Sequence, residues 1–225
     1  MLAHPLDMPA AGALKTRHQR FAQVEAGAMR YDPGIVPFSV VDPDDPMALG
    51  RLVKTGEVAV FLQAATVQTP PGFKAELRAD VVQMTADPQP FGAEDSRIIE
   101  LTANDAPAML ALATETRPGP FTLRARDLGT FWGIKENGKL VAMVGERMSL
   151  PGWSEVSGVC AAPEARGKGY ARLLSLKVMG EIANRGDQAF LHAWTTNEAA
   201  IGLYQSIGFT TRAELPVAMM RRVED

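Results

Sequence analysis

Residues 155–171 read EVSGVCAAPEARGKGYA, and they join a strand-like run at 156–160 to the start of a helix near Gly167. The N-terminus of a helix presents unpaired N–H groups and the positive end of the helix dipole, so it attracts anions. Small residues let a phosphate approach the backbone closely, and basic residues add positive charge. The small and basic residues at this helix start are Arg166, Gly167, Lys168, Gly169 and Ala171. The stretch therefore predicts a binding site for a phosphorylated cofactor.

Two familiar phosphate-binding loops are excluded by single residues of this stretch. A P-loop needs a glycine five residues before its Gly-Lys pair and a Ser or Thr after it, whereas Ala162 and Gly169 occupy these places. A dinucleotide-binding loop needs a third small residue where Arg172 stands, because a large side chain there prevents close packing of helix and strand. The pattern that remains is R-x-x-G-x-A at 166–171.

This remaining pattern resembles the acetyl-CoA signature Q/R-x-x-G-x-G/A of the GNAT N-acetyltransferases. A second block at 190–209, FLHAWTTNEAAIGLYQSIGF, resembles the other half of the GNAT core, N-x-x-A-x-x-x-Y-x-x-x-G-F. The residues that match it are Asn197, Ala200, Tyr204, Gly208 and Phe209. The two blocks come in the family's order with one helix between them, and the strand that begins at Glu155 is similar to that of the FR47-like branch. The resemblance covers roughly residues 97–221.

The resemblance implies an α/β fold with a mixed sheet, the GNAT acyl-CoA N-acyltransferase fold. In this fold acetyl-CoA binds where two neighbouring parallel strands splay apart, here 155–160 and 189–194. The free backbone of the first strand would pair with the pantetheine arm like an added strand, and the amides of the helix start would hold the pyrophosphate. The residues that the resemblance assigns to acetyl-CoA are Val159, Cys160, Ala161, Arg166, Gly167, Lys168, Gly169, Tyr170, Ala171, Asn197, Ala200 and Tyr204.

Acetyl transfer to an amine needs a deprotonated nucleophile, a polarised thioester carbonyl and a proton for the leaving thiolate. The resemblance places Tyr204 at the family's general-acid position. Glu155 is the expected base, with a pKa raised by burial, and Glu146 or a water molecule is the alternative. Cys160 as an acetylated nucleophile is less favoured than direct transfer, because no histidine lies near it in the sequence.

The acceptor has no readable signature in the sequence. His192 and Trp194 share a face of the second splayed strand, where both can line the acceptor pocket, although core packing is the expected role of Trp194. The loops at 113–129 and 147–153 are expected to set acceptor specificity. Four arginines can bind an acceptor carboxylate, but exposure on the surface is the simpler expectation for each: Arg117, Arg124, Arg126 and Arg147.

Composition limits the partners of this chain. Its 225 residues are 46% hydrophobic and 22% charged, as in ordinary globular proteins, and the net charge of −3 gives no electrostatic reason to expect nucleic acid or an anionic membrane. The longest apolar run, 58–67, is too short to span a membrane. A single cysteine and an N-terminus without signal-peptide features favour the cytoplasm. No cluster with the spacing of metal ligands is present, so no metal is expected.

Two parts are expected, with a boundary in the proline- and acid-rich segment 86–97. Residues 1–90 are expected to form an additional N-terminal α/β lobe, or a degenerate GNAT-like half, and residues 97–225 the GNAT domain. In the second part, Asn137-Gly138 predicts a hairpin turn between strands at 130–136 and 139–148. The elements predicted for the first part are helices at 12–27 and 44–52 and strands at 36–41, 57–62 and 81–84.

The expected function is direct transfer of the acetyl group of acetyl-CoA to a primary amine of a small molecule or amino-acid derivative. One alternative is a longer-chain, glycine-type N-acyltransferase, because acyl length depends on a pocket volume that the sequence does not show. Another is a catalytically silent CoA-binding sensor or scaffold. A homodimer is compatible with the resemblance, since GNAT relatives are often dimers.

Overall fold

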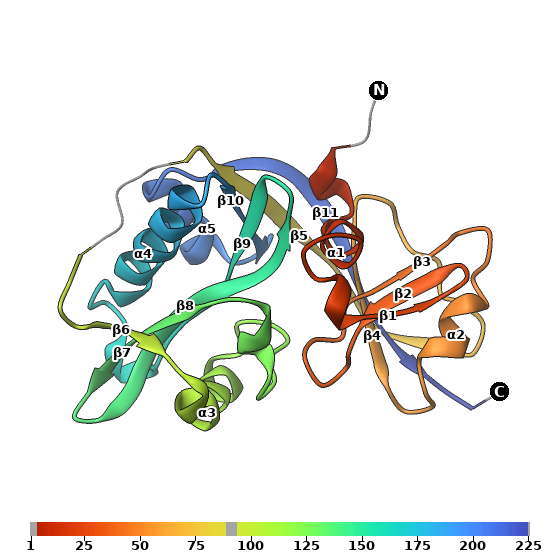
Figure 1. The fold of residues 1–225 in the computed structure, drawn as a ribbon, viewed down its shortest axis with the longest axis horizontal. Coiled ribbons are helices and arrows are strands. Elements are labelled where there is room, and N and C mark those ends of the chain that lie inside the picture. Colours follow the sequence, from red (N-terminus) through yellow and green to blue (C-terminus); the bar gives the residue numbers. More distant parts are fainter. Residues whose placement is uncertain (1–3, 89–93, 225) are drawn as a thin grey trace.

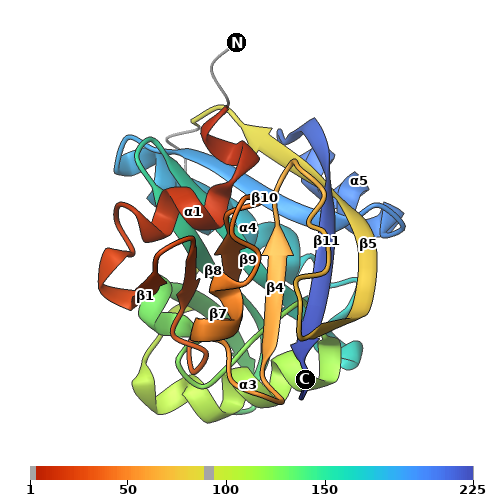
Figure 2. The same cartoon turned by 90° about the vertical axis from the view of Figure 1, so that its right-hand side faces the viewer.

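The computed structural model describes residues 4–88 and 94–224. Its main feature is a mixed eight-stranded sheet in the order β4-β11-β5-β10-β9-β8-β7-β6 (Figures 1 and 2). In chain order its strands are β4 (Val58–Leu62), β5 (Phe73–Ala86), β6 (Ile98–Leu101), β7 (Phe131–Glu136), β8 (Lys139–Leu150), β9 (Trp153–Ala161), β10 (Gln188–Trp194) and β11 (Thr210–Arg222). The mixed α/β class is as expected.

Helices and a small second sheet surround this main sheet. α4 packs against β7, β8, β9 and β10, and α3 against β8 and β9. The small sheet and α2 lie together at the other end of the molecule (Figure 1). The bounds of these elements are α1 (Pro9–Leu14), β1 (Ala22–Glu25), β2 (Ala28–Tyr31), β3 (Ser39–Val41), α2 (Ala48–Leu52), α3 (Ala106–Thr116), α4 (Tyr170–Asn184) and α5 (Glu198–Ser206). Short 3-10 turns cover Pro5–Asp7, Gln19–Phe21, Ala103–Asp105, Ala125–Leu128 and Pro163–Ala165.

The β7–β8 hairpin confirms the predicted turn at Asn137-Gly138. Both residues have positive φ, 49° and 80°, which is the backbone of a type I′ turn and requires residues that tolerate this region. β8 continues from this turn as an almost wholly buried strand, because elements pack on both of its faces. The hairpin thus holds β8 beside β9, the strand that begins the stretch quoted above.

One expectation for the first part was wrong, and a second was right but too short. The helix predicted over 12–27 ends at Leu14, and residues 22–25 form β1. The intervening residues 15–20 are polar and give a continued helix no apolar stripe to bury; Arg17 and His18 instead bind Asp187 and Tyr31. The strand predicted at 81–84 is the inner end of the 14-residue β5, whose outer half is largely exposed and polar.

The two predicted parts share one sheet. β5 lies between β10 and β11 and is antiparallel to both, and β4 pairs with β11. Val82 and Met84 of β5 belong to the same hydrophobic core as Leu191 of β10. The boundary at 86–97 therefore does not separate two sheets, and part of it, residues 89–93, lies outside the described residues. As a division into domains it stays a prediction.

Candidate active site

A cleft opens where β9 and β10 separate. These parallel strands are paired only from Trp153 to Glu155 on β9, opposite 188–190 on β10. Beyond this point β9 keeps its pairing with β8 alone, so its other backbone edge faces open space. The cleft between the separated strands has a volume of about 650 Å³. The splayed strands are those expected from the sequence.

Most of the residues assigned to acetyl-CoA line this cleft. Eleven of the twelve do so: Val159, Cys160, Ala161, Arg166, Gly167, Gly169, Tyr170, Ala171, Asn197, Ala200 and Tyr204. The twelfth, Lys168, is not in the lining, because its ammonium group binds both carboxylate oxygens of Glu136 at 2.9 Å. The Tyr170 hydroxyl also binds Glu136, donating to its Oε1 at 2.7 Å.

The N-terminus of α4 opens into the cleft without a side-chain cap. Its N-cap is Gly169, which has no side chain to accept from the first N–H groups. Gly167 and Gly169 both have φ of +75°, a left-handed backbone that favours glycine, so the turn depends on these two residues. By contrast, Asn197 caps α5, and its Oδ1 accepts from the Ala200 N–H at 3.1 Å. The unpaired amides of α4 are therefore available to an anion in the cleft.

Three arginines add positive charge to the cleft wall. Arg117 follows α3 with a φ of 52°, Arg166 precedes the helix, and Arg172 lies in the first turn of α4. Within residues 4–88 and 94–224, no ion pair joins any of the three to an acidic side chain. Their charges can therefore add to the attraction of the α4 N-terminus for phosphate groups.

Tyr204 and Cys160 lie close together in the cleft. Burial, with a smaller contribution from Cys160, raises the pKa of Tyr204 to about 12, so its hydroxyl is protonated at neutral pH. Burial raises the pKa of Cys160 to about 11, although a hydrogen bond with the Thr116 side chain partly opposes this. The thiol is therefore not ionised near neutrality, which disfavours Cys160 as a nucleophile.

The environment of Glu155 is not the one expected for a base with a raised pKa. Its carboxylate is fully buried and accepts from Arg147 Nε at 2.8 Å, from Arg147 Nη2 at 2.6 Å and from the Met148 N–H at 3.3 Å. Burial alone would raise its pKa, but the charge and hydrogen bonds of Arg147, together with His192, lower the pKa to about 2. The raised pKa expected for Glu155 is therefore wrong, and the group is a permanently charged partner of Arg147.

His192 is held as a neutral ring by two partners. Gln83 accepts from Arg212 through Oε1 and donates from Nε2 to the Leu6 carbonyl at 2.9 Å, which fixes the orientation of its amide. The same Nε2 lies 2.9 Å from His192 Nε2, so this ring nitrogen is an acceptor. The other nitrogen, Nδ1, then donates to Glu155 Oε1 at 2.7 Å. Burial also lowers the pKa of His192, in agreement with a neutral ring.

Trp194, at the end of β10, lines the cleft and is 37% exposed, so its expected core packing was wrong. Trp194 is the last residue of β10 and the most exposed one in that strand. Thr116 and Pro118 also line the cleft, and both lie in the region 113–129 that was expected to set acceptor specificity. Ala199 and Leu203 of α5 line it too, and the sequence did not single them out, because they belong to no motif.

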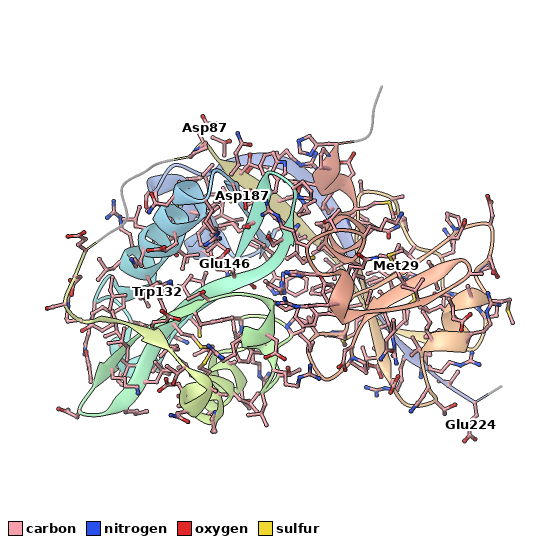
Figure 3. The ribbon with its side chains drawn as sticks, viewed as in Figure 1. Met29, Asp87, Trp132, Glu146, Asp187 and Glu224 are labelled. Carbon is pink, nitrogen blue, oxygen red and sulfur yellow. The ribbon has the colours of Figure 1, made fainter. Side chains whose placement is uncertain are left out.

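Glu146 has the opposite electrostatic environment from Glu155. Burial raises its pKa, although the Arg185 guanidinium, which donates to Glu146 Oε2, partly offsets the effect. Glu146 is a residue of β8, and Asp187 follows α4, just before β10 begins (Figure 3). Glu146 is outside the lining of the large cleft. It contributes instead to the wall of a second, smaller cavity.

This second cavity, called here the small cavity, has a volume of about 10 Å³. It lies between residues 35–36, the loop at 118–121, and Ser157 and Gly158 of β9, and Arg147 is in its wall. Pro118 lines both the small cavity and the cleft. Gly158 has a φ of +64° beside an irregularity in the β8–β9 pairing. The small cavity therefore meets β9 at the residues just before the cleft-lining stretch 159–161.

In the described part of the chain, no group of three or more His, Cys, Asp or Glu side chains comes together as metal ligands do. The described helices include none long and apolar enough to cross a membrane.

Comparisons with known proteins agree with this geometry. Residues 131–216 match the family model of FR47-like proteins. A solved structure from Novosphingobium aromaticivorans, assigned to the GNAT family of acetyltransferases, has a TM-score of 0.94 and 34% identity over 99% of this chain and 100% of that one. A GCN5-related N-acetyltransferase from Kribbella flavida has a TM-score of 0.60 over 96% of each chain, with 16% identity, which shows a likeness of fold alone.

A shorter match joins the chain to a curated protein, the mycothiol acetyltransferase of Thermobispora bispora. The two are 44% identical over 57 residues, which are 25% of this chain and 19% of that protein. The matched segment thus spans about a fifth of the relative's length.

Proposed function

Because the chain belongs to the GNAT superfamily of N-acetyltransferases, in its FR47-like branch, we propose that it transfers the acetyl group of acetyl-CoA directly to a primary amine. The acceptor is a small molecule or an amino-acid derivative. Acetyl transfer in general is supported by the fold and by relatives that are acetyltransferases. The choice of acetyl-CoA and the roles of individual residues are parts of the proposal.

The proposal depends mainly on one observation: two segments of backbone with unpaired hydrogen-bonding groups border the same cleft. The free edge of β9 leads to the uncapped N-terminus of α4, and both border the same space of about 650 Å³. CoA carries both groups that such surfaces recognise, a pantetheine arm with amides and a pyrophosphate. The backbone of 159–161 would pair with the arm, and the amides of 167–171 would hold the pyrophosphate. Arg117, Arg166 and Arg172 would add charge.

In the reaction, the amine nitrogen forms a bond to the thioester carbonyl carbon, and the carbon–sulfur bond breaks. The nitrogen loses a proton to a base, and the thiolate gains one from an acid. Tyr204 suits the acid role, since it lines the cleft and keeps its proton at neutral pH. An amide N–H of β9 near Cys160 would stabilise the oxyanion.

Glu146 is the carboxylate that we propose as base, acting through a water molecule. A base working near neutrality needs a pKa above the ordinary carboxyl value, and burial moves Glu146 in that direction. Glu155 has the opposite shift, and Arg147 and His192 already occupy its oxygens. We therefore assign Glu155 to holding these two side chains in place.

Release of CoA thiol tests the proposal. Purified protein is incubated with acetyl-CoA and a panel of primary amines, and thiol is measured against a sample without amine. Amine-dependent release that a Tyr204→Phe variant loses supports direct transfer with this acid. A longer acyl-CoA that reacts faster than acetyl-CoA would favour the longer-chain acyltransferase. Binding of CoA without release for any amine would favour the silent sensor or scaffold.

A further inference from the structure

The small cavity lies where the acceptor has to arrive. In the proposed binding mode, with the pyrophosphate at 167–171 and the arm along 161–159, the acyl end of the cofactor would be directed toward Gly158, which is in the wall of the small cavity. The loop residue Pro118 connects the two spaces. Side chains of the small cavity are thus placed to meet whatever is attached to the attacking amine.

Arg147 has one free donor group in this place. Its Nε and Nη2 both bind Glu155, and its guanidinium stacks on the Phe38 ring at 4.7 Å from the ring centre. No hydrogen bond joins Nη1 to any residue in the described ranges. A Cβ on Gly119 would lie 3.8 Å from Nη1, so this nitrogen faces the loop at 118–121 across the small cavity. The guanidinium is thus fixed on one side and unoccupied on the other.

The charge around Nη1 is already balanced. Glu155 neutralises Arg147, and His192 beside Glu155 is a neutral ring. Arg147 is the one cation among the described residues that line the small cavity, and Glu146 in the same wall is paired with Arg185. A second carboxylate would have to leave water for a site with no net positive charge, which is costly. An uncharged carbonyl oxygen can accept from Nη1 without this cost.

The small cavity has room for a single atom of the acceptor. About 10 Å³ is roughly the space of one water molecule, which a carbonyl oxygen can occupy in its place.

We propose that Arg147 is a specificity residue that donates from Nη1 to an uncharged carbonyl oxygen of the acceptor, so that the acceptors are amines with a nearby amide rather than free amino acids. This inference rests on the proposed acetyl transfer. It replaces the expectation that Arg147 is a surface residue or a carboxylate ligand.

Three amines that share the same CH3–CH–NH2 unit test the inference: alaninamide, alanine and 2-aminopropane. CoA release is measured for each. Because the three differ in amine pKa, kcat/KM is calculated from the concentration of the unprotonated amine. We expect alaninamide to exceed 2-aminopropane by about 10- to 100-fold, the effect of one hydrogen bond from a charged donor, and to exceed alanine as well. Trialanine amide is a fourth substrate. A higher kcat/KM for it than for alaninamide would indicate that the acceptor is the N-terminus of a peptide rather than a small amide.

Variants then assign the preference to Arg147. Arg147→Lys keeps a cation beside Glu155 but has no second nitrogen to donate to the acceptor carbonyl. The ratio of kcat/KM for alaninamide to kcat/KM for 2-aminopropane should therefore fall toward 1. The double variant Arg147→Met with Glu155→Gln removes both charges together and should do the same. Arg124→Lys is the matched control, because this loop arginine binds Asp32 and Asp127 on the surface, and the ratio should stay at the wild-type value. Acetyl-CoA binding by each variant shows that it is folded.

A wild-type preference for alanine, or an unchanged ratio in Arg147→Lys, would overturn the inference. So would the absence of turnover with alaninamide when other amines react. Failure of every amine to release CoA would overturn the proposed function itself, which separates the two.

Discussion

At the scale of single residues, the two buried glutamates show how neighbouring charges divide similar side chains into different roles. Glu155 and Glu146 lie on adjacent strands, and both lose contact with water. Two hydrogen bonds from Arg147 and one from His192 keep Glu155 ionised. Glu146 has one arginine partner, which does not outweigh its burial. The sequence names both residues but not their partners, so it could not tell which has the raised pKa.

Replacing Glu146 by Gln should lower turnover at neutral pH by about 10²–10⁴-fold, the usual effect of losing a general base. The pKa of Glu146 is raised, so wild-type activity falls as the pH drops through that value and the carboxylate is protonated. The Gln variant should lack this dependence, and its deficit should shrink at high pH, where free amine is abundant. The pH profile of kcat/KM measures both effects. A variant with the wild-type profile would exclude Glu146.

Replacing Glu155 by Gln should act on stability instead. It leaves the Arg147 charge buried without a partner, which costs about 3–5 kcal/mol. Because the folded-state pKa is lowered to about 2, the stabilisation by Glu155 is complete above the ordinary carboxyl pKa and is lost as the pH falls toward 2. The difference in unfolding free energy between wild type and variant should therefore narrow on acidification. Urea unfolding at several pH values tests this, and a constant difference would contradict it.

At the scale of elements, the contrast between α4 and α5 distinguishes a ligand site from an ordinary helix start. Asn197 caps α5, whereas α4 begins at a glycine and opens into the cleft. The glycine spacing and the β7–β8 hairpin were readable in the sequence, whereas the splayed strands were implied by the resemblance to the GNAT family. Such signals are local, because the type of a residue such as glycine or asparagine determines which backbone conformations it tolerates. β5 was missed over most of its length because its outer half is polar.

Gly169→Ala should weaken acetyl-CoA binding. The alanine Cβ would meet no atom within 4 Å, so the effect comes from forcing a φ of +75° on a residue that disfavours it. The helix start then shifts, and its amides lose their alignment with the pyrophosphate. Gly138→Ala is the matched control, with a φ of +80°, equal space and a position in the hairpin turn. Calorimetry should show weaker binding for the first variant alone; equal affinities would contradict the role of the α4 start.

At the scale of the whole molecule, the first 90 residues complete both the sheet and the site. β5 fills the place between β10 and β11, and Arg212 reaches Asp7 at 2.8 Å. Gln83 of β5 joins His192 to Leu6, so a buried polar chain runs from the cleft to the N-terminal segment. Contacts between residues this distant in the chain have no local signature. The sequence therefore indicated a separate lobe and missed the shared sheet.

Deleting residues 1–90 should leave a fragment that does not fold. It removes β4 and β5, which exposes the edges of β10 and β11 and part of the main core. Circular dichroism with thermal unfolding of the remaining fragment, residues 91–225, measures this. A cooperative transition together with acetyl-CoA binding would show instead that the second part is an independent domain.

Calorimetric titration with acetyl-CoA, CoA and ATP tests whether the cleft between β9 and β10 binds acetyl-CoA. We expect micromolar binding of acetyl-CoA and CoA and none of ATP, because the cleft joins a strand edge for pantetheine to a helix start for pyrophosphate. Failure of both CoA species to bind would contradict this assignment of the cleft.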